Sequence, residues 1–293
     1  MLKHTTITRD RIRQFVEFQL REQLVLDHAE APAELLIAAC AGPAEADAAK
    51  GWKPVKAGDT WGPTYQEGWY RVRAEVPVEL RGQSLVLTYG KPEIAWERGE
   101  MVEGTLFSGG VAVGGLDYAH NWFRLPGGAT SVDYLVQTFA HNAETTVHRP
   151  EKPRTPQPEV FRGFLFAAVD EELLALYLDC AFAQDFLVAV GEDDPAYATV
   201  LRALNDVCNL FGAGRPKSLA PSRKVLRDAL DSLGNELKHT ITPVGHAHLD
   251  TAWLWPLAVT HLKMTHTTAL QLDLMDRYPE HVFAHSQASQ YEW

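Results

Sequence analysis

The sequence is poor in cysteine and in positive charge. Only three cysteines, Cys40, Cys180 and Cys208, occur in 293 residues. No two of them form a C-x-x-C pair, which disfavours a disulfide framework and fits a reducing compartment. Lysine and arginine number 27 against 38 aspartate and glutamate, giving a formal net charge of −11. This acidic balance argues against nucleic acid or an anionic membrane surface as the main partner.

Long apolar runs are also missing. No stretch of about 18 apolar residues occurs, and the start, residues 1–6, lacks the apolar segment of a signal peptide. We therefore expect a cytoplasmic protein that does not enter a membrane. Apolar residues make up 46% and charged residues 22% of the chain, which is typical of an ordinary globular protein. The length suffices for about two domains.

Residues 1–50 predict an N-terminal helix followed by a hinge. From Thr8 to His28 the apolar residues recur at spacings of mostly three and four, with charges between them. This is the pattern of an amphipathic helix. The segment after it, up to residue 50, is rich in alanine, proline and glutamate and is interpreted as the hinge.

Residues 51–162 predict a β-sandwich domain. Short alternating runs at 68–77, 84–89 and 131–139 are typical of strands, and several strands at such spacing favour an antiparallel sandwich. The segment also contains five tryptophans, and large aromatic side chains usually dominate core packing. We therefore favour sandwich core and rim over a carbohydrate-binding face for Trp52, Trp61, Trp69, Trp96 and Trp122. The four prolines of 150–158 indicate a stiff connector.

Residues 163–237 predict a helical connector. Helical periodicity occurs in three leucine- and alanine-rich stretches, 170–185, 194–210 and 222–237. The fourth segment, 238–293, changes character again and predicts the start of an α/β domain. Its signals are a β-branched run at 240–244, a helix at about 256–278 and a second apolar segment at 282–286.

The chemistry-bearing residues lie in the stretch T-I-T-P-V-G-H-A-H-L-D-T-A-W-L-W-P, residues 240–256. It places His246, His248 and Asp250 at alternate positions, which in an extended backbone point to one face. Imidazole nitrogen with carboxylate oxygen suits zinc or a related divalent metal. Trp253 and Trp255 follow and supply flat apolar surface on which the face of a sugar ring could pack.

Ligands at the carboxyl end of a parallel strand are where α/β barrels and open α/β sheets carry their chemistry. One strand, one helix and a second strand cannot bury their own faces. Either another chain completes the sheet or this is the front part of a longer protein, and we favour the second.

G-H-A-H-L-D-T-A-W-L-W-P at 245–256 and S-Q-A-S-Q-Y-E-W at 286–293 resemble the start of the catalytic domain of family-38 glycoside hydrolases, the α-mannosidases of the cytosolic and bacterial kind. The G-W-Y-R-V-R string at 68–73 and the first helix extend the resemblance upstream. It implies a multidomain α/β and β protein, in which a β-sandwich and a helical connector precede the truncated start of a (β/α)7-type barrel.

The resemblance also implies roles for individual residues. His248 and Asp250 match the family's first pair of metal ligands, Trp253 matches the aromatic residue that stacks under the mannose ring, and His246 matches a supporting position. The metal implied is zinc, with cobalt as the alternative. The substrate implied is an α-mannoside oligosaccharide, cleaved with retention by two carboxylates. The nucleophile and the acid/base residue are expected beyond Trp293, so no catalytic carboxylate is assigned within this chain and the chain alone is expected to be inactive and to bind zinc weakly.

Three other interpretations remain open. Metallo-β-lactamase-type hydrolases continue the motif as H-x-H-x-D-H, and Thr251 at that position disfavours this class. In an amidohydrolase-type barrel His246 and His248 would both be ligands and Asp250 would be free. A non-catalytic carbohydrate-binding protein would bind sugar through residues 51–162 without metal. The sequence also leaves open whether the full-length protein forms a homo-oligomer.

Overall fold

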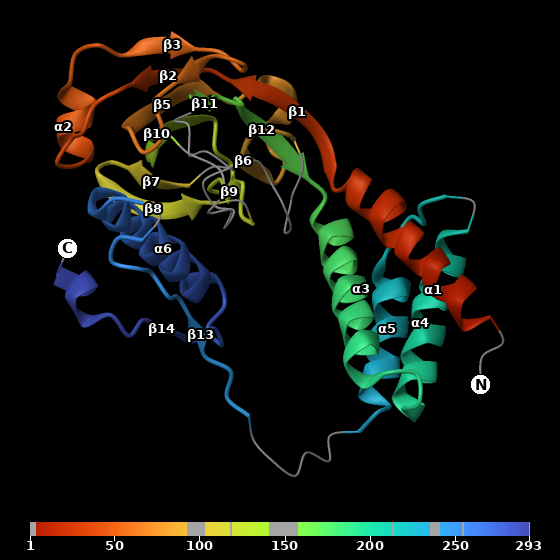
Figure 1. Cartoon of the computed structure of the whole chain (residues 1–293). Coiled ribbons are helices and arrows are strands. Elements are labelled where there is room, and N and C mark those ends of the chain that lie inside the picture. Colours follow the sequence, from red (N-terminus) through yellow and green to blue (C-terminus); the bar gives the residue numbers. More distant parts are fainter. Residues whose placement is uncertain are drawn as a thin grey trace. The chain divides into compact units, whose positions relative to one another are not determined.

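The computed structural model describes residues 4–92, 103–117, 119–140, 158–212, 214–234, 241–253 and 255–292, and the structural statements below concern these residues. They divide into two compact units (Figure 1). The first unit combines Met1–Leu26 with Val169–Ile241, and the second combines Asp27–Ala168 with Thr242–Trp293. Each unit is therefore built from two separate stretches of the chain. The predicted connector at 150–158 and Trp96 lie outside the described residues, except for Pro158.

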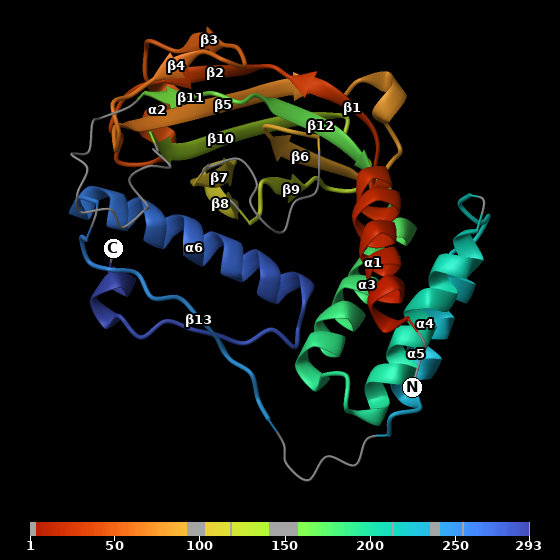
Figure 2. The same ribbon diagram turned by 45° about the vertical axis from the view of Figure 1, so that its right-hand side comes forward.

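The first unit is made of helices that lie side by side (Figure 2). Its described helices are α1 Thr5–Gln14, α3 Glu171–Val190, α4 Pro195–Phe211 and α5 Ala220–Asp231. α1 continues as a π-helix, Phe15–Leu20, and a 3-10 turn, Arg21–Gln23. Its apolar stripe, including Ile12 and Phe15, is buried, and Phe15 packs edge-on against Phe211 of α4. The three predicted connector helices are thus present, although α5 ends at Asp231 and residues 235–237 of its predicted range lie outside the described residues.

The predicted first helix is wrong from Val25 onward. Strand β1, Val25–Ala31, begins there, and β2, Ala33–Leu36, follows it where a hinge was expected. Both strands pair within the sheets of the second unit. Sheet pairing with distant strands outweighs the local helical pattern, because propensity is a weak determinant once tertiary contacts are available.

Helix α3 is almost uniformly apolar. By length and composition it is the one described helix that could cross a membrane. However, one side of α3 is buried, and this side includes Leu173, Leu176 and Cys180. Asp179 of α3 also forms an ion pair with Arg223 of α5, at 2.6 Å. A core helix passes the same length and composition test. Cys180 and Cys208 are buried and Cys40 is partly buried, and all three are free thiols.

The second unit contains an antiparallel β-sandwich, as the sequence predicts. One described sheet has the order β1-β12-β6-β9, formed by Val25–Ala31, Phe164–Val169, Leu85–Tyr89 and Trp122–Arg124. The other has the order β3-β2-β5-β10-β7-β8, formed by Lys53–Val55, Ala33–Leu36, Glu67–Glu75, Ser131–Phe139, Gly104–Ser108 and Val111–Leu116. A separate pair joins β4 Thr60–Trp61 to β11 Glu159–Val160, and short helices are α2 Pro43–Ala48 and a 3-10 turn at Val78–Leu80.

The sandwich core is aromatic. Alternation along β5 directs Tyr70 and Val72 into one core cluster, where Tyr70 meets Phe161 and Phe164 with ring centroids 4.9 and 5.6 Å apart. Of the four tryptophans in this segment that the structure describes, Trp61, Trp69 and Trp122 are buried and Trp52 is partly buried. This favours the core interpretation over a sugar-binding face.

Helix α6, Leu257–Arg277, packs on the sandwich beside β7 and β8 (Figures 1 and 2). The approach is close at Gly115, where a Cβ atom would lie 2.8 Å from the His266 carbonyl oxygen and 3.2 Å from Leu270 Cβ. Next to this contact, the Asp117 carboxylate accepts hydrogen bonds from the backbone N–H groups of Ala119 and His120 and lies 3.8 Å from His266 Nε2. Burial alone would raise the pKa of Asp117, but its interactions with His120 and His266 hold that pKa well below the usual range.

The last part of the chain forms a β-α-β unit around α6. β13, Gly245–His246, pairs in parallel with β14, Phe283–Ala284. The predicted strand, helix and second strand are therefore present, although β13 begins after the β-branched run and both of its residues are exposed. A closed barrel stays a prediction.

Asp170 provides a stability test in the helical unit. Its carboxylate caps α3 by accepting from the Leu173 N–H at 3.0 Å and pairs with Arg215. Burial opposes its ionisation, but these interactions outweigh burial and lower its pKa. We expect Asp170→Ala to reduce the free energy of unfolding by about 1–2 kcal/mol at neutral pH, measured by urea unfolding.

The pH dependence distinguishes this ionised cap from a neutral one. A lowered pKa means that the contribution is fully present above about pH 4, the ordinary carboxyl value, and is lost as the pH falls through the lowered pKa. The deficit of Asp170→Ala should therefore shrink in acid. Asp194→Ala, which removes the exposed cap of α4, is the matched control. A deficit of Asp170→Ala that is unchanged in acid would contradict the assignment.

Candidate functional site

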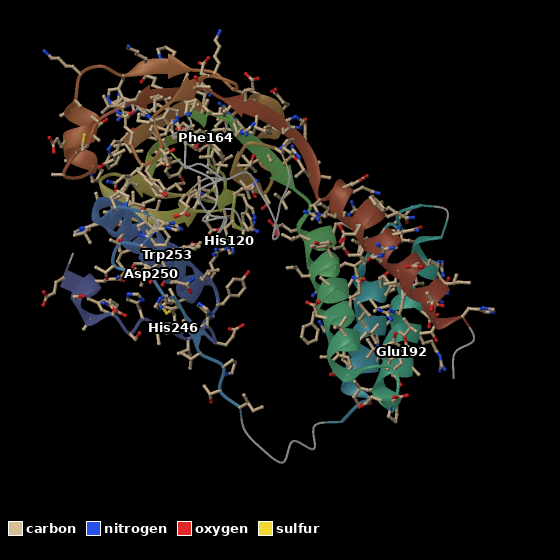
Figure 3. All side chains as sticks on the ribbon, viewed as in Figure 1. His120, Phe164, Glu192, His246, Asp250 and Trp253 are labelled. Atoms are coloured by element: carbon tan, nitrogen blue, oxygen red, sulfur yellow. The ribbon has the colours of Figure 1, made fainter. Side chains whose placement is uncertain are left out.

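The predicted site residues lie on the segment that joins β13 to α6 (Figure 3). Only His246 belongs to a strand, and residues 247–250 have no regular secondary structure. β13 is held in place because the Gly245 N–H donates to the Val282 carbonyl oxygen at 2.8 Å. The prediction that His246, His248 and Asp250 alternate along one strand is therefore wrong, because the strand ends at His246.

The structure nevertheless brings His248 and Asp250 together. His248 Nε2 lies 3.3 Å from Asp250 Oδ1, and their side chains are 79% and 39% exposed. Two donors bound to one tetrahedral zinc ion at about 2.0–2.1 Å lie about 3.3–3.4 Å apart. The observed separation therefore fits two ligands of a single ion as well as it fits a hydrogen bond. Both side chains remain accessible to further ligands.

His246 takes a different partner. Its Nε2 lies 3.2 Å from Ser286 Oγ, which follows β14. Within the described residues no group of three or more histidine, cysteine, aspartate or glutamate side chains forms a metal-binding cluster. His246 is thus placed to anchor β13 to the segment after β14. The potential metal ligands that lie next to each other are therefore two, His248 and Asp250.

Two residues after β14 hold the loop between His246 and Trp253, and sequence reasoning assigned them no role. The imidazole of His285 lies between the loop and Gln290. Its Nδ1 is 3.0 Å from the Ala247 carbonyl oxygen, and its Nε2 is 2.7 Å from Gln290 Oε1. Gln290 is buried, and its Nε2 donates to the Leu249 carbonyl oxygen at 2.9 Å and to Thr251 Oγ1 at 3.1 Å. The string at 286–293 therefore contains a residue that supports the loop at 245–256.

Thr260 holds the other end of the loop. Its fully buried hydroxyl accepts from the Ala252 N–H at 3.1 Å and from Trp255 Nε1 at 3.0 Å, and it donates to the Asp250 carbonyl oxygen at 3.1 Å. Ala252 adopts a left-handed conformation, φ 58°, which is uncommon for a residue other than glycine. The first turn of α6 thereby imposes a sharp bend directly after Asp250.

The two tryptophans form an aromatic corner beside the His248–Asp250 pair. Trp253 and Trp255 meet edge to face, with centroids 5.5 Å apart and planes at 89°. Trp253 is 50% exposed, so part of its indole surface is open to a ligand. Figure 3 shows Asp250 and Trp253 close together at the side of α6. Glu292 and Asp276 are both exposed.

Two known protein families match the two stretches of the chain that form the second unit. The "Alpha-mannosidase, jelly roll domain" matches residues 26–160, and the "Glycosyl hydrolases family 38 N-terminal domain" matches residues 238–293. The first match begins within β1, which agrees with the sheet membership of that strand. In this chain the segment similar to the jelly roll domain therefore precedes the segment similar to the family 38 N-terminal domain.

Curated relatives carry the identification further. Alpha-mannosidase 2C1 of Mus musculus is 25% identical over 100% of this chain and 29% of its own length. Alpha-mannosidase 2C1 of Homo sapiens is 29% identical over 83% of this chain and 23% of its own length. The chain is thus similar to the N-terminal part of the family-38 glycoside hydrolases, the α-mannosidases. It spans less than a third of the length of either relative.

Among solved structures, a β-glucuronidase from Ruminococcus gnavus overlaps 51% of this chain and 30% of its own with a TM-score of 0.30 and 11% identity. A likeness of that size carries no argument about the site.

Thr260→Val tests the role of the buried hydroxyl. The substitution keeps the shape of the side chain but leaves two N–H donors and one carbonyl without their partner. We expect the free energy of unfolding to fall by about 2–3 kcal/mol. Urea unfolding followed by tryptophan fluorescence would measure it. Thr260→Ser, which keeps the hydroxyl, should stay near the wild type.

Thr268→Val on the same helix is the matched control, because the Thr268 hydroxyl has only a long contact of 3.8 Å to Met264 Sδ. An equal loss of stability in both valine variants would mean that the Thr260 hydroxyl has no special role.

Proposed function

We propose that this chain supplies the N-terminal part of a metal-dependent retaining α-mannosidase that cleaves terminal α-mannosidic bonds of oligosaccharides. The observation that carries the proposal is the His248–Asp250 pair, 3.3 Å apart within the segment that matches family 38. We place the start of the catalytic domain at residue 238, where that match begins. The helices before it would then form the connector from the jelly roll.

In this proposal His248 Nε2 and Asp250 Oδ1 are two ligands of a divalent ion, zinc or alternatively cobalt. Their separation fits such an ion, and a histidine–carboxylate set suits either metal. When bound, the ion would coordinate sugar hydroxyls next to the reacting carbon and favour a distorted ring. His285, Gln290 and Thr260 keep the backbone around both ligands in place, which reduces the reorganisation that binding requires.

Trp253 would bind the sugar. Its half-exposed indole lies in the same loop as Asp250 and can pack against the C–H face of a mannose ring. His246 has a supporting role through Ser286. The nucleophilic carboxylate and the acid/base carboxylate of retaining hydrolysis are expected outside this chain.

The protein is expected to work in the cytoplasm on oligosaccharides, since the relatives it resembles are α-mannosidases and its free thiols suit a reducing compartment. The net charge of −11 disfavours nucleic acid and anionic membranes as partners. A homo-oligomer of the full-length protein is compatible with this function.

An amidohydrolase-type enzyme is the second candidate, and the contacts of His246 disfavour it. That class would use His246 and His248 as joint ligands. Here His246 contacts Ser286, and His248 contacts Asp250. A non-catalytic carbohydrate-binding protein is disfavoured because three sandwich tryptophans are buried.

The decisive experiment measures hydrolysis of para-nitrophenyl α-mannoside by the complete gene product. Chelation should abolish activity, and added zinc or cobalt should restore it. Asp250→Ala should lower kcat/KM by about a thousandfold or more, because a lost metal ligand removes several kcal/mol of transition-state stabilisation. Asp276→Ala, an exposed carboxylate on α6, is the control and should leave kcat/KM unchanged.

Hydrolysis of amides or esters in place of mannosides would support the amidohydrolase interpretation, and His246 would then be the next residue to substitute. Sugar binding that survives chelation without any hydrolysis would support the binding protein.

The 293-residue chain by itself should hydrolyse no mannoside and should bind zinc weakly, because a catalytic zinc site normally has three or more protein donors. Calorimetric titration with zinc would measure this. Tight zinc binding by the isolated chain would contradict it.

A further inference from the structure

A buried ion pair connects the sandwich to α6 near the candidate site. Lys263 Nζ of α6 lies 2.6 Å from Glu103 Oε1, and the two side chains are only 12% and 16% exposed. Glu103 directly precedes β7, and its carbonyl oxygen accepts a hydrogen bond from the Thr138 hydroxyl of β10 at 2.7 Å. The backbone of Glu103 is therefore held to the sheet, and its carboxylate pairs with the ammonium group.

The same ammonium group lies over two aromatic rings. Lys263 Nζ is 4.7 Å from the centroid of Trp255 and 5.5 Å from that of Phe139. Phe139 ends β10, whereas Trp255 belongs to the loop that carries the site. A cation within about 6 Å of an indole face is attracted to it, most strongly where water is excluded. Lys263 thus ties the Trp255 ring to the sandwich.

Trp255 connects Lys263 to Trp253, the residue proposed to bind the sugar. Its ring meets Trp253 edge to face, and its Nε1 donates to Thr260 Oγ1, which also binds the Asp250 carbonyl oxygen. The orientation of the Trp255 plane therefore limits the orientation of Trp253. Trp253 itself is half exposed, and this ring contact restricts its orientation.

We propose that Lys263 is a positioning residue for substrate binding, and that the sandwich, through Glu103, sets the orientation of the Trp255–Trp253 corner against which the sugar packs. This inference rests on the proposed function, because it takes Trp253 as the sugar-binding surface. It gives the sandwich a part in the site, without direct contact with the substrate.

A purely structural clamp between α6 and the sandwich is the competing explanation. However, α6 already contacts the sandwich further along its length, at Gly115 and through His266 and Asp117. A clamp would also need no aromatic partner in the loop. The two explanations differ in what neutralising the ion pair should change.

The test compares variants of the complete gene product. Glu103→Gln combined with Lys263→Met removes both charges at similar volume, which avoids leaving one charge buried and unpaired. The tryptophan corner is followed by its indole exciton signal in circular dichroism, assigned by difference with Trp253→Phe. We expect the double variant to lose most of this signal. For a para-nitrophenyl α-mannoside, KM should rise by about three- to thirtyfold while kcat changes by less than about twofold.

Two controls separate positioning from clamping. Lys263→Arg retains a cation over the indole and should keep most of the exciton signal and a KM near that of the wild type. Asp117→Asn weakens the other contact of α6 and should change neither. If the double variant fails to fold, Glu103→Gln combined with Lys263→Gln, which removes both charges but keeps groups that can hydrogen-bond to each other, provides the same comparison.

An unchanged exciton signal or an unchanged KM in the folded double variant would overturn the inference, as would an equal change in Asp117→Asn. A wild-type protein without mannosidase activity would instead contradict the proposed function. The two failures are distinguishable, because the exciton signal is measured without substrate.

Discussion

The candidate site depends on how the backbone polar groups of an irregular loop are satisfied. Residues 247–250 have neither helical nor strand hydrogen bonds, and unpaired polar groups in a partly buried segment are costly. Side chains from outside the loop replace the missing partners: Thr260 from the first turn of α6, and His285 and Gln290 from the segment after β14. The shape of the loop is therefore decided by these neighbours, and the positions of His248 and Asp250 follow from it.

Thr260 is itself placed by the sandwich, because α6 packs against it. β8 lies so close to α6 that only a glycine fits at residue 115, and the Glu103 carboxylate pairs with Lys263 of the same helix. Packing of this kind transmits position, because close-packed contacts leave little free volume to absorb a displacement. A jelly roll in front of a catalytic domain could have been an independent module. Its contacts with α6 make it part of the support on which the site loop is built.

Much of this was predictable from local patterns, and the exceptions share one cause. The period-two alternation of residues 68–77 predicted β5, and the paired spacing of His248 and Asp250 predicted two neighbouring donors even though regular strand ends at His246. The helix expected to reach His28 ends earlier, because β1 finds partners in a sheet whose other strands lie far along the chain. Gln290 was missed for the same reason. Its contact with Leu249 spans 41 residues, and no local periodicity signals such a contact.

In the proposed metal site, the exposure of His248 and Asp250 bears on where the affinity for the ion would come from. The His248 side chain is 79% exposed, so its imidazole is largely hydrated, and two accessible donors alone gain little over water as ligands. Affinity must then come mainly from further donors. What this segment contributes is the position of the backbone that carries both residues, held by Thr260 and Gln290 through hydrogen bonds that need no ion. A preorganised pair lowers the entropic cost of assembling the complete site. In the proposed enzyme, this segment would thus contribute the hydrogen-bonded shape of the loop as well as the two ligands it carries.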